Sequence, residues 1–133
     1  MNRDEALRAL VTEQRLSGAN LILARMWVYQ RDMETQSRTY AEAKTYYERT
    51  RATLITTLTM ADSEGKKLSV AAAEQNAEAD PDVWKAALGY RLAEQMVTAD
   101  KEALKILHAE LEKWRTERAD ERAADSFTAR TGT

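Results

Sequence analysis

The chain has no cysteine, one proline, one histidine and four glycines among its 133 residues. Without cysteine it has no disulfide scaffold, no cysteine-ligated metal and no thiol nucleophile. A single histidine excludes the usual zinc sites built from several histidines. So few prolines and glycines also supply too few turns for a β-sandwich.

The chain also lacks a large net charge, because 20 basic residues nearly balance 22 acidic ones. This balance argues against disorder and against wholesale coating of nucleic acid. No apolar run approaches the ~20 residues that span a bilayer. The start of the chain, Met1–Glu5, is not followed by an apolar stretch of secretory type. We therefore expect no membrane contact and a cytoplasmic location.

What is abundant is the composition of long helices, since Ala, Glu, Lys, Leu and Arg make up about half of the chain. Uncharged residues recur at every seventh position of the N-terminal half, which predicts an amphipathic helix. This row is Met26, Met33, Tyr40, Tyr47, Leu54 and Ala61. The C-terminal half carries a matching row, Val83, Tyr90, Val97, Leu104 and Leu111, with a companion row that ends at Trp114.

Local signals set the expected helix boundaries. Ser17-Gly18 predicts a break, Gly65 is expected to cap the first long helix, and Asp80-Pro81 is typical of a new helix start. We expect one domain over 1–125, with a flexible tail over 126–133. The predicted helices are 3–16, 19–61, 70–79 and 81–124.

These features predict an all-α fold, a long antiparallel helical hairpin with an extra N-terminal helix. The apolar face of the last helix is broad, and so broad a face is expected to have more than one neighbour. The residues that extend it are Leu88, Leu92, Met96, Ala99, Ala103 and Ile106. We therefore expect self-association, as a dimer or tetramer, to complete a bundle, with the two rows and Trp114 as its core and self-association stripe. Trp84 is expected to be packed, with a role at an interface as the alternative.

No constellation of catalytic residues is evident. The acidic residues are scattered, and His108 follows Lys105 where a di-metal bundle would place Glu three residues before His. We find no glycine-rich phosphate loop and no Ser/His/Asp set. The sequence predicts neither an enzyme, nor a cofactor, nor a bound metal.

One stretch interleaves aromatic and basic residues, the pattern by which proteins hold single strands without sequence preference. The alternative is that Tyr40 and Tyr47 belong to the core row and that the basic residues are a solvated face. The candidate nucleic-acid strip is Arg38, Lys44, Tyr46, Arg49, Arg51, Lys66 and Lys67.

Several short motifs resemble those of small helical phage and prophage proteins encoded near recombination or replication genes. The matching residues, within about 38–125, are Tyr40-x-x-Ala43-Lys44, Glu64-Gly65-Lys66, Trp84-Lys85-Ala86-Ala87-Leu88 and the run from Lys101 to Leu111. The resemblance implies a non-catalytic accessory role, in the cytoplasm of the host cell, without catalytic residues to carry over.

The expected function is therefore that of a helical accessory protein that acts by self-association and by binding a protein partner through its helix surfaces. A weak, sequence-independent single-stranded DNA-binding protein is one alternative. A phage-made inhibitor of a host protein is another.

Overall fold

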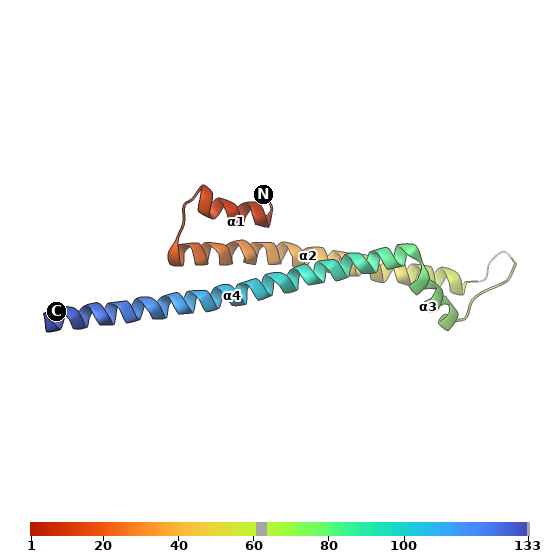
Figure 1. The fold of residues 1–133 in the computed structure, drawn as a ribbon. Coiled ribbons are helices and arrows are strands. Elements are labelled where there is room, and N and C mark those ends of the chain that lie inside the picture. Colours follow the sequence, from red (N-terminus) through yellow and green to blue (C-terminus); the bar gives the residue numbers. More distant parts are fainter. Residues whose placement is uncertain (61–63, 133) are drawn as a thin grey trace. The chain divides into compact units, whose positions relative to one another are not determined.

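The computed structural model describes residues 1–60 and 64–132, and all of their regular structure is helical (Figure 1). The helices are α1 (Arg3–Thr12), α2 (Gly18–Thr59), α3 (Val70–Ala79) and α4 (Pro81–Thr131). The predicted all-α class is confirmed. Of the predicted features, Ala61 in the first row and Thr133 at the end of the tail lie outside the described residues.

Capping explains where the short helices begin. Asn2 and Glu5 form a capping box before α1, in which the Asn2 side chain accepts from the Glu5 backbone N–H at 2.9 Å. Ser69 caps α3 by accepting from the N–H of Ala72. The Asp80 carboxylate accepts from the N–H groups of Asp82 and Val83, so α4 begins at Pro81 as predicted.

α1 ends four residues before the predicted end at 16. Arg15 has a left-handed backbone with φ 52°, and the N–H of Leu16 donates to the carbonyl of Leu10 at 2.9 Å. This is the turn that normally carries glycine. The predicted break before α2 is confirmed, and Gly18 at its start has φ 58°.

The two long helices also differ from their predicted ends. α2 ends at Thr59, two residues before the predicted end at 61. α4 continues to Thr131, well past the predicted end at 124, although every described residue after Trp114 is exposed. Ion pairs one turn apart support this last part, including Arg115–Glu112 at 2.9 Å and Arg118–Glu121 at 3.0 Å.

The contacts divide the chain into two units. Unit 1 comprises Met1–Met33 and Ala99–Thr133, and therefore α1 with the first part of α2 and the last part of α4. Its buried residues are Ala9, Leu10, Asp100, Leu107 and Leu111. The Trp114 indole lies near the start of α2, where a Cβ added to Gly18 would be 3.5 Å from Nε1.

Unit 2, Glu34–Thr98, holds the rest of α2, all of α3 and the start of α4. The rings of Tyr40 and Tyr47, which lie about two turns apart on α2, both contact the ring of Tyr90 on α4. The centroid of the Tyr90 ring is 6.3 Å from that of Tyr40 and 5.0 Å from that of Tyr47. Small side chains fill most of the core, so the helices approach closely. The buried residues are Ala73, Ala77, Val83, Ala86, Ala87 and Ala93.

The predicted core rows face the neighbouring helices in both units. Val83 and Leu111 are buried, and the other described residues of the two rows, together with Trp114, are half-buried: Met26, Met33, Tyr40, Tyr47, Leu54, Tyr90, Val97, Leu104 and Trp114. No residue of α2 is buried. A helix of 42 residues without one buried side chain is only partly covered by its own chain.

Candidate functional site

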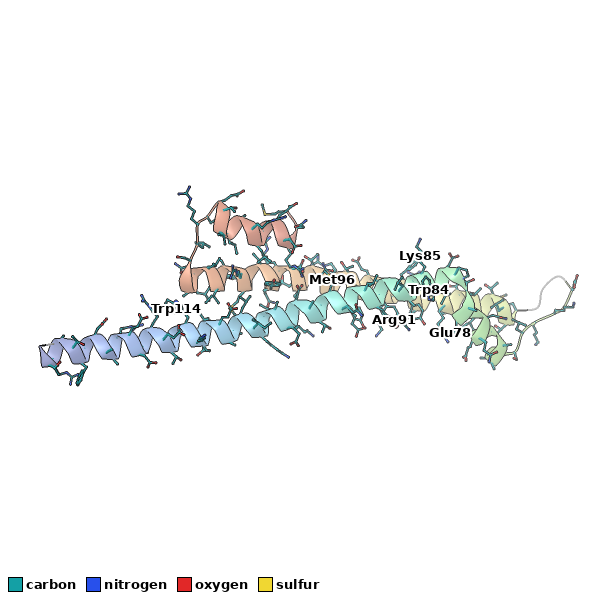
Figure 2. The ribbon with its side chains drawn as sticks, viewed as in Figure 1. Glu78, Trp84, Lys85, Arg91, Met96 and Trp114 are labelled. Carbon is teal, nitrogen blue, oxygen red and sulfur yellow. The ribbon has the colours of Figure 1, made fainter. Side chains whose placement is uncertain are left out.

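In unit 2, α4 has a second apolar face directed away from the Tyr40–Tyr47–Tyr90 cluster. We call Trp84, Leu88, Leu92 and Met96 the outer face of α4. These side chains are 62%, 41%, 54% and 39% exposed, respectively. Figure 2 labels the two ends of the row, Trp84 and Met96.

Helix geometry explains how one segment carries two apolar faces. Successive residues are about 100° apart, so the outer face lies roughly opposite the inward side of α4. Val83, Ala87 and Ala93 of that inward side are at most 8% exposed. A large indole and three aliphatic side chains in a row over about three turns form a contiguous exposed patch, which is typical of an interaction surface.

The predicted nucleic-acid strip is not a single strip in the structure. Lys44 and Arg51 are seven residues apart and therefore lie on the same side of α2 as Tyr40 and Tyr47. Lys44 sits over the Tyr40 ring at 5.7 Å, and the Arg51 Nε donates to Glu78 at 3.0 Å. Hydrogen bonding to Tyr40 raises the pKa of Lys44, and hydrogen bonding to Glu78 raises that of Arg51.

The other predicted strip residues lie elsewhere. Arg38, Tyr46 and Arg49 point from a different side of α2, and Tyr46 is 63% exposed. Lys66 and Lys67 are exposed in the segment before α3, and Lys66 pairs with Glu64 at 3.5 Å. The structure brings together Tyr46 and Arg49, but not the set of seven.

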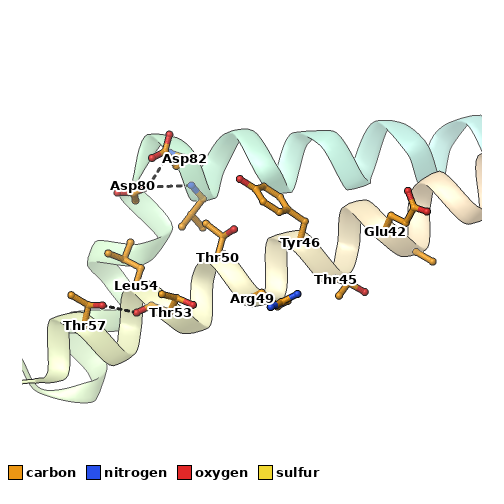
Figure 3. A pocket seen from close by; sticks show the side chains of 12 residues that line it. Glu42, Thr45, Tyr46, Arg49, Thr50, Thr53, Leu54, Thr57, Asp80 and Asp82 are labelled. Atoms are coloured by element: carbon orange, nitrogen blue, oxygen red, sulfur yellow. Dashed lines mark hydrogen bonds between the residues drawn. The ribbon is translucent and has the colours of Figure 1, made fainter.

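Tyr46 and Arg49 line a groove of about 810 Å³ in unit 2 (Figure 3). Its other polar side chains include the carboxylates of Glu42, Asp80 and Asp82. Three carboxylates beside one guanidinium give the groove a net negative charge, which repels phosphate. The groove therefore does not have the electrostatics of a nucleic-acid site.

Unit 1 contains a partly buried cluster of charged side chains from three helices. Asp100 of α4 is fully buried and accepts from Arg3 Nη1 of α1 at 2.9 Å. Asp32 of α2 is 3.7 Å from the same nitrogen, and Arg3 also lies 5.6 Å from the centroid of the Tyr29 ring. The Arg3 guanidinium therefore contacts both of these carboxylates, and its Nε also lies 3.4 Å from the exposed carboxylate of Asp4.

Asp32 Oδ2, the oxygen 3.7 Å from Arg3 Nη1, and Asp100 Oδ2 are buried and have no hydrogen-bond partner among the described residues. Loss of solvent around Asp100, and then the hydrogen bond that its protonated form makes with Asp32, raise its pKa to about 6, against the opposing effect of Arg3. A proton on Asp100 lets its carboxyl group donate to Asp32 while it accepts from Arg3.

Only part of this cluster has a signal in the sequence. Asp100 is the one charged residue in the companion row Ala86, Ala93, Asp100, Leu107 and Trp114, so its burial could have been anticipated. Nothing local connects it to Arg3, which is 97 residues away.

Within the described residues, no group of three or more potential metal-ligating side chains occurs. Across the same 1–60 and 64–132, no helix is long and apolar enough to cross a membrane. No protein-family model, curated protein or solved structure matches the chain.

Proposed function

We propose that the chain is a non-catalytic helical interaction protein that associates with itself through the outer face of α4. The observation that supports this proposal is the exposure of Trp84, Leu88, Leu92 and Met96 on the side opposite the core of unit 2. Covering such a face removes apolar area from water, which is the main driving force for protein association.

The sparse core supports the same proposal. Most of the buried residues of unit 2 are alanines, and α2 contributes none at all. Two helices and a short third one bury little apolar surface per residue, so a further layer adds stability that one copy lacks.

The biological setting that we propose is a phage-encoded accessory protein of a recombination or replication module, which rests on the resemblance of the motifs alone. Binding of a further protein partner, including inhibition of a host protein, would use helix surfaces that self-association leaves free. The mixed charge of the Tyr46–Arg49 groove makes single-stranded DNA the weaker alternative.

The test is solution mass by light scattering over a range of concentrations, with Leu92→Gln as the variant. We expect the wild-type mass to exceed 15.1 kDa and to rise with concentration, and the variant to stay closer to the monomer. Phe127→Gln is the matched control, because Phe127 is 66% exposed on the same helix but outside the outer face. A monomeric wild type, or equal effects of both variants, would contradict the proposal.

A further inference from the structure

We infer that the occupant of the outer face is the outer face of a second copy, packed antiparallel around a two-fold axis at the level of residue 90. This inference rests on the proposed function and specifies its partner and geometry. The outer-face residues are spaced by four along the chain, from Trp84 to Met96.

A row spaced by four forms one of the natural ridges of a helix surface. Two such ridges that pack into each other's grooves cross at about −50°, the commonest class of helix packing. Helices that cross at this angle touch over only a few turns. The outer face has this extent, four residues over about three turns, or roughly 18 Å along the axis. The pattern fits a short crossing and not a long coiled-coil seam, which needs alternating steps of three and four.

The order of side chains is self-complementary when the row is reversed. Around an axis at position 90, Leu88 faces Leu92 of the second copy, and Trp84 faces Met96 of the second copy. The indole thus meets a flexible thioether side chain that adapts its shape to an aromatic ring.

The exposed area suits a small two-copy interface. Trp84 is 62% exposed and therefore still has roughly 150 Å² to bury. With Leu88, Leu92 and Met96, the outer face offers on the order of 400 Å² per copy, about half of the ~800 Å² that each partner of a standard interface buries. Flanking stems such as that of Lys85 add to it. An interface of this size is typical of a transient dimer in exchange with monomer, and not of an obligate one.

The absence of cysteine makes the geometry directly testable by disulfide trapping, because any crosslink must come from an introduced thiol. Two single variants are prepared, Trp84→Cys and Met96→Cys, and each is oxidised alone and in an equimolar mixture. In the antiparallel dimer, Trp84 of one copy is level with Met96 of the other. Two copies of position 84 are roughly 18 Å apart along the axis, too far for a disulfide.

We expect a crosslinked dimer in the mixture and none from either variant alone, as judged by non-reducing electrophoresis. Phe127→Cys, also exposed on α4, serves as the control for random collision. Crosslinking of Trp84→Cys to itself would overturn the inference in favour of a parallel pair. A protein that is dimeric by light scattering but does not crosslink in the mixture would overturn the inference and leave the proposed function standing. A monomer by light scattering would remove both.

Discussion

At the scale of single residues, Asp100 is the position where sequence pattern and chemistry disagree most. It occupies a core position, yet it is an ionisable group, fully buried between Arg3 and Asp32. Removal of one partner from such a group leaves the remaining charge unpaired, which is costly. A carboxyl group that keeps its proton avoids this cost, because it can donate to Asp32 while accepting from Arg3.

The pH dependence follows from the direction of the pKa shift. The pKa of Asp100 is about 6 in the folded protein, above the ~3.9 of an unfolded aspartate, so the folded state binds the proton more tightly. The stabilising contribution of this group is therefore complete below pH ~4 and is lost as the pH rises through about 6. Its full size is on the order of 3 kcal/mol.

We predict that Asp100→Asn removes this dependence, since an amide imitates the protonated carboxyl group at every pH. The melting temperature of the variant relative to wild type should rise between pH 4.5 and pH 7.5. Asp4→Asn is the control, because Asp4 also contacts Arg3, at 3.4 Å, but is 71% exposed. A constant difference between Asp100→Asn and wild type across this range would show that Asp100 does not titrate as described.

At the scale of secondary-structure elements, the turn after α1 stores local strain. Arg15 adopts φ 52°, a left-handed conformation that costs a residue with a side chain roughly 1–2 kcal/mol. The structure maintains it because the N–H of Leu16 reaches the carbonyl of Leu10 only through such a turn. α1 can fold back into unit 1, where Arg3 reaches Asp100, because this turn separates it from α2.

We predict that Arg15→Gly raises the stability of the protein by about 1 kcal/mol, measured by urea unfolding. Glycine adopts the left-handed conformation without steric cost, and this gain exceeds the entropy that it adds to the unfolded chain. Arg8→Gly is the matched control, since the same change in the interior of α1 should lower stability by about 1 kcal/mol. Destabilisation by both changes would mean that Arg15 makes a contact that outweighs its backbone strain.

At the scale of the whole molecule, the sequence predicted what local chemistry decides and missed what distant contacts decide. The start of α4 at Pro81 and the range of α3 followed from Asp80 and Ser69, which act on their own neighbours. The inward placement of Tyr40 and Tyr47 followed from helical periodicity. The breadth of the apolar face at Leu88 and Leu92 was also visible in the sequence. The sequence did not show which apolar side chains of α4 are buried by the same chain and which stay exposed, because this depends on the packing of α2 against α4.

The exposed outer face of α4 leads to a prediction about the stability of the whole assembly. If the outer face of α4 is covered only in a dimer, folding and association are linked, and the melting temperature must depend on protein concentration. We expect the melting temperature of the wild type to rise between roughly 5 and 500 µM, because each tenfold excess over the dissociation constant adds about 1.4 kcal/mol. Leu92→Gln should show a weaker dependence, and Phe127→Gln should follow the wild type. If the melting temperature of the wild type does not change over this range, association does not stabilise the fold. The exposed row from Trp84 to Met96 would then bind a partner other than a second copy.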